Sequence, residues 1–268
     1  MKFFEKRRNG NKFSLTILGF PFDFTIKTKR TPPEKMPEEY RNLFTLDGRI
    51  PVLDYYIDET FNSIRCKKFK MKSYNEVFDK LSKGTFPYYG KTINYIMDAL
   101  RKYPIKGKSV CVFGAIAVNC DAISIFNGAE SVVILEYNPV RSEHPKVRCM
   151  SYGEYENNGI KCDVGISISS FEHDGLTRYG DPINPYGDLQ TMQKVKNLIK
   201  KDGLLYLSVP VGPDAVCWTA HRIYGKIRLP MLLEGWKLLE SFGFDESILE
   251  GEPSIHYVDQ PVFVLKNI

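Results

Sequence analysis

The stretch SVCVFGAIAVNCDAISIFNGAESVVIL, residues 109–135, decides the fold. It holds two short apolar runs of strand-like composition, Ser109–Phe113 and Ser131–Leu135. The segment between them has apolar residues at helical spacing and ends at Asn127-Gly128, a good helix C-cap. A strand, a crossover helix and a second strand predict two parallel neighbours in one sheet.

The alternation of strand-like and helix-like runs continues to the C-terminus. It predicts a mostly parallel α/β sheet with helices on both faces. Further strands are expected at residues 147–150, 164–168 and 204–209, and a helix with an apolar face is expected over residues 189–199. A last helix is expected around Leu232, Trp236 and Leu239. Strands expected at 254–258 and 261–265 are separated by only two residues, so they must be antiparallel.

The residues before this region predict an N-terminal extension. Apolar residues at period two between Phe13 and Ile26 predict a β-hairpin, which either adds edge structure or forms a basic, aromatic docking surface. The Pro- and charge-rich segment 31–51 predicts a connection with a short helix, and an amphipathic helix is expected from Lys91. We therefore expect a hairpin and helical extension at 1–88 and the main domain at 89–268.

Composition narrows the class of protein. A chain of 268 residues, 43% of them hydrophobic, fits one sizeable domain with an appendage. The net charge of +5 is modest, so a nucleic-acid partner is not expected. The six cysteines form no CxxC pair and no zinc-site spacing, which favours a reduced, cytoplasmic setting. No stretch approaches the roughly 20 apolar residues of a membrane span, so any membrane contact is expected to be peripheral, at the inner face.

Two loops at the carboxyl ends of the first two strands are candidates for ligand binding, because ligands of doubly wound sheets lie there. Gly114 and Ala115 let a ligand approach the backbone, although a plain tight turn explains them as well. Glu136, followed by Tyr137 and Asn138, ends the second strand, where a carboxylate can accept hydrogen bonds from both ribose hydroxyls. The alternative for Glu136 is a surface carboxylate that caps a loop.

Several motifs resemble known families. SSFEH, residues 169–173, and IKKDGLLYLSVP, residues 199–210, are similar to motifs of class I S-adenosylmethionine-dependent methyltransferases. The string from Phe171 to Asp188, with EYNP, SVPVGPD and AHRIYGKIRLP, resembles an uncharacterised-domain family first named from nematode proteins, domain of unknown function 268. The resemblance spans about Val110 to Trp236. It implies the Rossmann-like class I methyltransferase fold, with a C-terminal antiparallel strand pair and S-adenosylmethionine as the cofactor.

The resemblance extends the set of candidate residues. It adds Ser170 to the cofactor site and places adenine near Glu154, for which a solvated turn is the alternative. Methyl transfer to a hydroxyl needs a base, and His173 is the candidate, because imidazole titrates near neutral pH. Alternatively, His173 braces the loop or touches the cofactor. Asp181 is expected to orient an imidazole or to grip sugar hydroxyls.

Two polar segments, residues 172–188 and 221–228, supply the candidate substrate residues. These are Arg178, Tyr179 and Asp188 in the first segment and Arg222 and Tyr224 in the second. The second segment also contains His221, a further catalytic candidate, and it is expected to recognise a phosphate, carboxylate or sugar. Alternatively, its charges only solvate a surface insertion, and Asp188 is only the N-cap of a helix that begins at Leu189. A metal site built from His173, Asp181 and His221 is not expected, because no ligand pair has a recognisable spacing.

The N-terminal segment, residues 4–30, resembles the leader of bacterial enzymes of capsule, lipooligosaccharide and flagellar glycan synthesis. We therefore expect an O- or N-methyltransferase that acts on a sugar, sugar nucleotide or surface glycan. This segment is expected to contact a membrane or a glycan-assembly partner. The glycine loop lacks the usual GxGxG, and the polar loop at residues 172–188 is acidic. These two features leave open another sugar-modifying enzyme, such as a lyase or epimerase. A non-catalytic binding subunit on the same fold is a third alternative.

Overall fold

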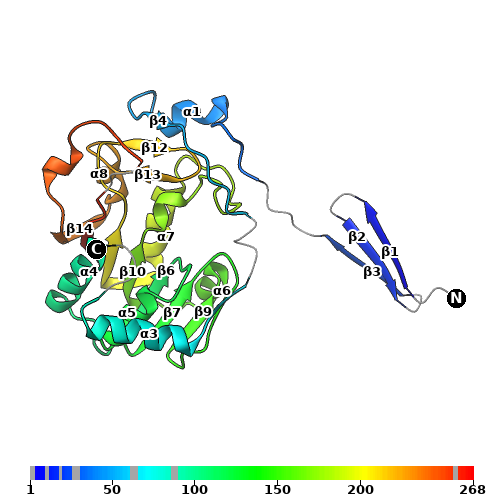
Figure 1. Ribbon diagram of the computed structural model, residues 1–268, viewed down its shortest axis with the longest axis horizontal. Helices are drawn as coiled ribbons and strands as arrows, with labels where there is room; N and C mark the ends of the chain where they lie inside the picture. The colour runs from blue at the N-terminus through cyan, green and yellow to red at the C-terminus, as the bar shows by residue number, and fades with distance from the viewer. Residues whose placement is uncertain are drawn as a thin grey trace. The chain divides into compact units, whose positions relative to one another are not determined.

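The computed structural model describes residues 4–9, 12–17, 20–25, 31–60, 66–85, 90–255 and 259–268. The chain divides into two compact units, Met1–Thr31 and Pro32–Ile268 (Figure 1). This division differs from the expected boundary between residues 88 and 89. The reason is that apolar residues upstream of 88, such as Phe44 and Tyr74, pack into the cores of the larger unit.

The N-terminal unit is an antiparallel sheet with the order β1-β2-β3. Its strands are Phe4–Asn9, Lys12–Ile17 and Phe20–Thr25. The expected hairpin is confirmed as β2 and β3, while its last expected residue, Ile26, lies outside the described residues. β1 is an additional strand that pairs with β2.

The larger unit is built around a seven-stranded sheet with the order β14-β15-β11-β10-β6-β7-β9. Its strands are β6 (Ser109–Phe113), β7 (Ser131–Leu135), β9 (Val147–Met150), β10 (Cys162–Ile168), β11 (Ile199–Ser208), β14 (Trp236–Phe242) and β15 (Val262–Asn267). β15 is antiparallel to both of its neighbours, β11 and β14, and the other pairs of this sheet are parallel. Numbered along the chain, the strands lie in the order 3-2-1-4-5-7-6, which is that of the Rossmann-like class I methyltransferase fold. The expected fold class is confirmed.

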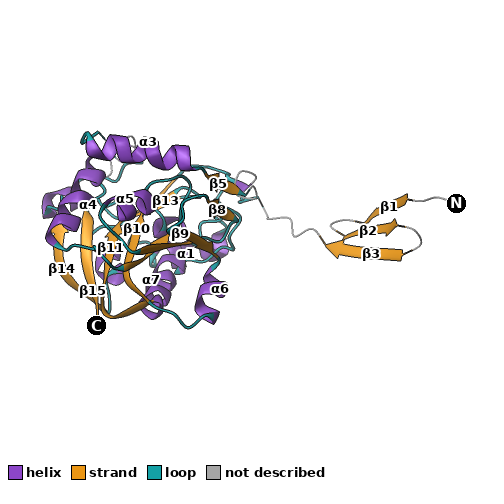
Figure 2. Cartoon of the chain, turned by 90° about the horizontal axis from the view of Figure 1, so that it is seen from below, coloured by secondary structure: helices purple, strands orange, loops and turns teal. Residues whose placement is uncertain are grey.

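Alternate residues of the central strands face two separate cores. Val110 and Val112 of β6 pack in the core that contains α3 (Met71–Ser82), α4 (Lys91–Lys102) and α5 (Cys120–Phe126). Cys111 and Phe113 pack in the core that contains α6 (Tyr152–Asn157), α7 (Gly187–Leu198) and α8 (Arg228–Leu232). Helices therefore cover both faces of the sheet (Figure 2). Ligands of such sheets lie at the carboxyl ends of the strands.

The helix expected around Leu232, Trp236 and Leu239 is wrong in its second half. Helix α8 ends at Leu232, and Trp236 begins the strand β14. Gly235 lies between them with a φ of +78°, a conformation that stops a helix. The residues that follow gain an antiparallel ladder against β15 instead.

The strand expected at 254–258 is also not observed where it can be judged. Ser254 and Ile255 lie outside any strand, and 256–258 are outside the described residues. The antiparallel pair that ends the sheet is therefore formed by β14 and β15.

Short elements outside the main sheet complete the larger unit. Helix α1 (Glu38–Thr45) is the short helix expected between 31 and 51, and β4 (Val52–Leu53) follows it. The remaining elements are β5 (Lys67–Phe69), β8 (Val140–Ser142), β12 (Ala215–Cys217), β13 (His221–Ile223) and the 3-10 turns η1 (Phe171–His173) and η2 (Glu246–Leu249). A small sheet of β13, β12 and β4 carries one of the polar segments. Within the described ranges, no helix has the length and apolar character needed to span a bilayer.

Candidate active site

Gly114 forms a tight turn directly after β6. Its φ is +75°, and a Cβ placed on it would lie 2.2 Å from Oγ of Ser170, just beyond β10. The Gly114 N–H donates to the carbonyl oxygen of Leu135 in β7 (3.0 Å). The turn therefore joins the ends of three adjacent strands, and only glycine fits there.

The carboxylate of Glu136 connects the loops after β6 and β7. Its Oε2 accepts the N–H of Ala115 (3.0 Å), and its Oε1 accepts the N–H groups of Tyr137 (2.8 Å) and Asn138 (3.3 Å). The structure thus brings together the expected residues of these two loops. Each carboxylate oxygen has two lone pairs, so Glu136 can cap the loop and still accept a hydroxyl of a ligand.

Tyr137 and Tyr152 form an aromatic pair at the same edge of the sheet. Their ring centroids are 4.6 Å apart, and the rings are nearly parallel, with an interplanar angle of 23°. Tyr137 is exposed, whereas Tyr152 is buried in the first turn of α6. The pair offers a flat surface beside Glu136. Sequence reasoning misses Tyr152, because its partner follows a different strand.

Glu154 holds the first turn of α6. Its Oε2 accepts hydrogen bonds from the N–H and Oγ of Ser151 (2.7 Å each), while Ser151 Oγ accepts the N–H of Glu154. These bonds form a capping box and hold the pKa of Glu154 below its usual range. The contacts match the alternative of a solvated, capped turn. A contact with adenine stays a prediction.

His173 is largely buried in η1, and its lowered pKa makes it a weak proton acceptor near neutral pH. Its Nδ1 lies 2.6 Å from the carbonyl oxygen of Ala220, so Nδ1 donates and Nε2 carries no proton in the neutral ring. Burial, followed by the charge of Arg178, lowers the pKa of His173 to about 3. These contacts favour the alternative in which His173 braces the loop.

Among the described residues, Asp181 contacts no imidazole, so the first of its two expected roles is not observed, and a contact with sugar hydroxyls stays a prediction. Its Oδ2 accepts the N–H groups of Gly175 (2.8 Å) and Thr177 (3.2 Å), and its Oδ1 accepts that of Tyr179 (3.4 Å). The carboxylate is therefore used by the backbone and shapes the loop after η1.

His221 is partly buried in β13, and burial lowers its pKa to about 4. In the described part of the chain, its Nε2 has no hydrogen-bond partner. The described residues contain no group of three or more His, Cys, Asp and Glu side chains that could hold a metal ion.

Arg178 and Tyr179 lie beside His173. The Arg178 guanidinium lies 5.2 Å from the centre of the Tyr179 ring, which packs edge-on against His173. Arg178 Nη2 pairs with Oε1 of Glu59 (2.9 Å), and the Glu59 N–H donates to the Arg178 carbonyl oxygen (3.0 Å). Sequence reasoning misses Glu59, since no pattern places its polar, aromatic segment against the sheet.

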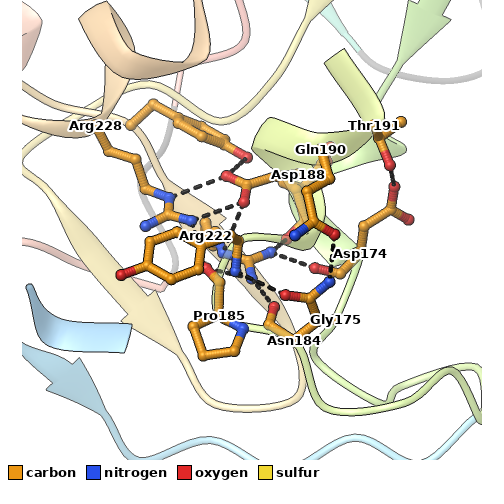
Figure 3. A network of polar contacts seen from close by, with 12 residues as sticks. Asp174, Gly175, Asn184, Pro185, Asp188, Gln190, Thr191, Arg222 and Arg228 are labelled. Atoms are coloured by element: carbon orange, nitrogen blue, oxygen red, sulfur yellow. Dashed lines mark hydrogen bonds and ion pairs between the residues drawn. The ribbon is translucent and has the colours of Figure 1, made fainter. Parts of the chain in front are cut away.

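Asp188, Arg222 and Tyr224 are buried scaffold residues, which corrects their expected role in substrate binding. Figure 3 shows Asp188 between the guanidinium groups of Arg222 and Arg228. Arg228 Nε and Nη2 donate to the two Asp188 oxygens (2.9 and 2.7 Å), and the Tyr224 hydroxyl donates at 3.0 Å. All four residues are 0% exposed, so they cannot meet a ligand from solvent. Asp188 is not an N-cap either, because α7 begins one residue earlier.

Arg222 holds the loop that follows β10. Its Nη1 donates to the carbonyl oxygens of Glu172 (3.3 Å) and Asp174 (2.7 Å). Its Nη2 donates to those of Asn184 (3.1 Å) and Pro185 (3.4 Å), as Figure 3 shows for the labelled residues. One buried guanidinium therefore fixes both ends of the polar loop.

Two carboxyl groups in this loop have unusual acidity. Burial raises the pKa of Glu172 and of Asp174 to about 7. Asp174 Oδ2 accepts a hydrogen bond from Thr191 Oγ1 in α7 (2.5 Å). The sequence marks both as polar residues of the loop, but their acidity depends on burial, which no local pattern reveals.

Comparison with known proteins identifies one family and several distant likenesses. Residues 107–251 match the model of the family described as "Caenorhabditis protein of unknown function, DUF268". Among solved structures, the chain resembles 1,6-didemethyltoxoflavin-N1-methyltransferase from Burkholderia thailandensis, with 13% identity, 98% of each chain covered and a TM-score of 0.48. It also resembles the N-methyltransferase NodS from Bradyrhizobium japonicum WM9, with 10% identity, 66% of this chain and 94% of that chain covered and a TM-score of 0.43. The search of curated proteins found no match.

Proposed function

We propose that this chain, which belongs to the DUF268 family, is an S-adenosylmethionine-dependent O- or N-methyltransferase whose acceptor is a sugar, sugar nucleotide or surface glycan. The observation that carries the proposal is the Glu136 carboxylate at the end of β7, bonded to the loop that Gly114 begins. The acceptor class rests on the resemblance of residues 4–30 to leaders of glycan-synthesis enzymes. We assign to the same segment a contact with a membrane or a glycan-assembly partner on the cytoplasmic side.

The residues around the Gly114 turn fit the nucleoside part of this cofactor. The Gly114 turn lies against Ser170 beyond β10 and beside Glu136, and the remaining lone pair of the Glu136 carboxylate would accept a hydrogen bond from a ribose hydroxyl. The exposed ring of Tyr137 offers a surface for a purine. When bound, S-adenosylmethionine supplies an electrophilic methyl group.

The chain's own residues would orient the acceptor and take its proton. Arg178, fixed between Glu59 and Ala220, presents donors next to the loop after β10. A hydroxyl acceptor also needs a base whose pKa is close to the working pH. The pKa of Asp174, raised to about 7, suits this role better than that of His173, lowered to about 3.

Glu136→Gln is the test of the proposed cofactor site. We expect it to weaken the binding of S-adenosylhomocysteine about 10- to 100-fold, since hydrogen bonds to charged groups contribute about 1.5–3 kcal/mol. Isothermal titration calorimetry measures the change. Glu130→Gln is the matched control, because Glu130 is exposed and precedes the same strand β7 at its opposite end. Equal affinities of the two variants, or no binding of either S-adenosyl compound by folded wild-type protein, would reject the proposal.

A further inference from the structure

The sheet of the N-terminal unit separates apolar from polar residues by face. Successive residues of a strand lie on opposite faces of a sheet. The register pairs Lys6 with Leu15 and Leu15 with Phe22, so these three residues share one face. Seven of the nine residues on that face are apolar, and five of them are phenylalanine. The nine residues form the apolar face: Phe4, Lys6, Arg8, Phe13, Leu15, Ile17, Phe20, Phe22 and Phe24.

The opposite face of this sheet is polar. Its nine residues, of which only the proline is apolar, are Glu5, Arg7, Asn9, Lys12, Ser14, Thr16, Pro21, Asp23 and Thr25. A sheet with one apolar face needs a second layer over that face. The unit Met1–Thr31 contains no helix and no second sheet in its described residues. The unit itself therefore supplies no such layer.

The first 30 residues carry the excess positive charge of the chain. Eight of them are Lys or Arg and two are Asp or Glu, which gives a net charge of +6, against +5 for the whole chain. The rest of the chain is therefore close to neutral and offers little counter-charge. A basic segment joined to a nearly neutral domain indicates a partner with dense negative charge. Lys6 and Arg8 belong to the apolar face, so that face combines both properties.

The edges of the sheet disfavour pairing with a strand of another copy. The edge strands are β1 and β3. β3 contains Pro21, whose nitrogen cannot donate to a ladder, and β1 contains three consecutive basic residues, Lys6 to Arg8. Two copies packed by their apolar faces would bring two segments of net charge +6 together, which like-charge repulsion opposes. A second copy is therefore a poorer partner than an anionic surface.

We propose that the apolar face docks on a bilayer surface that contains anionic phospholipid. The inference narrows the membrane or partner contact assigned to residues 4–30 above, and it rests on that part of the proposed function. A bilayer interface provides an apolar layer directly beside anionic headgroups, which matches a face with seven apolar and two basic residues. A nucleic acid provides the negative charge without the apolar layer.

Vesicle flotation of the full chain tests the partner. We expect the wild-type protein to bind vesicles with about 30% phosphatidylglycerol in phosphatidylcholine at least about tenfold more tightly than vesicles of phosphatidylcholine alone. Binding should weaken as the salt concentration rises, because salt screens the attraction between the basic residues and the headgroups. Folded wild-type protein that floats with neither kind of vesicle would overturn the inference.

Two double variants test which face docks. Lys6→Glu with Arg8→Glu alters the apolar face, and Arg7→Glu with Lys12→Glu alters the opposite face by the same net charge. Each basic residue near an anionic bilayer strengthens binding about fivefold, so we expect about 30-fold weaker binding for the first variant. The second should lose less than about fivefold. Equal losses would mean that net charge alone attracts the chain, and the apolar face would not be the docking surface.

A single substitution tests the apolar contribution. Phe22→Ala removes apolar area from the docking face, and we expect about tenfold weaker binding to the anionic vesicles. Thr16→Ala, on the opposite face of the neighbouring strand, should leave binding unchanged. A dimer that forms without vesicles and that Phe22→Ala dissociates would assign the face to a second copy instead. The wild-type comparison of the two kinds of vesicle decides the partner even if a variant does not fold.

The binding of S-adenosylhomocysteine, measured on the same samples, separates this inference from the proposed methyl transfer. Both double variants should keep the wild-type affinity for this compound. Wild-type protein that docks on anionic vesicles but binds neither S-adenosyl compound would leave the docking surface standing while the proposed cofactor site fails. Wild-type protein that binds S-adenosylhomocysteine but not the vesicles would overturn the docking surface and leave the cofactor site standing.

Discussion

Asp188→Asn is expected to lower the free energy of unfolding by about 3–5 kcal/mol, because it removes the carboxylate between two buried guanidinium groups. Arg222 and Arg228 would then lie in the core without their counter-charge, and both are 0% exposed. Urea denaturation at pH 7 measures the loss. The two arginines also hold the loop after β10, so the variant should expose that loop to proteolysis.

An exposed ion pair provides the control for this prediction. Glu250→Gln removes the partner of Lys226, and the side chains of this pair are 61% and 66% exposed. Such pairs contribute about 0–1 kcal/mol. A loss for Asp188→Asn no larger than that for Glu250→Gln would show that the buried network is not a stabilising scaffold.

The contribution of Asp188 to stability also depends on pH. The two arginines hold the pKa of Asp188 below its usual range, so its contribution is present at neutral pH and is lost as the pH falls through that lowered pKa.

Gly114→Ala is expected to weaken the binding of S-adenosylhomocysteine by about 100-fold or more, equivalent to about 2.7 kcal/mol. The new Cβ would lie 2.2 Å from Ser170 Oγ, so the ends of β6 and β10 must separate, and the φ of +75° is strained for alanine. Calorimetry measures the affinity, and thermal melting reports how much variant is folded.

Gly107→Ala separates the two effects. Gly107 has a φ of +72° just before the same strand β6, but a Cβ there would meet nothing within 4 Å. It should lose about 1–2 kcal/mol of stability from backbone strain and keep its affinity. Ser170→Gly combined with Gly114→Ala should recover part of the binding, since it removes the atoms in the way. Unchanged affinity in Gly114→Ala would mean that the turn is not part of the cofactor site.

The sequence predicts β6, β7 and β9 with their observed bounds, because β6 and β7 are short apolar runs that follow a serine, and β9 is a shorter run interrupted only by Arg148. The predicted bounds fix where β6 and β7 end. The sequence alone therefore places Gly114 and Glu136 next to each other. β14 could not be predicted, because its apolar residues also fit a helix and its pairing with β15 is a long-range contact.

The polar residues show where local patterns stop being informative. Asp188 and Arg222 have the composition of a substrate site, and only their burial identifies them as scaffold. Glu59 and Arg178 are paired across more than a hundred residues of chain, which no spacing can predict. A charged residue that follows a strand is therefore a candidate for the site, and its contacts decide whether it faces a ligand or supports the loop.

A crystal structure of the chain with S-adenosylhomocysteine is the most direct test of the proposed cofactor site. We expect the adenosine between the Gly114 turn and Tyr137, with a ribose hydroxyl bonded to the Glu136 carboxylate. Adenosine density elsewhere on the chain, or bound ligand whose ribose does not contact Glu136, would contradict this expectation.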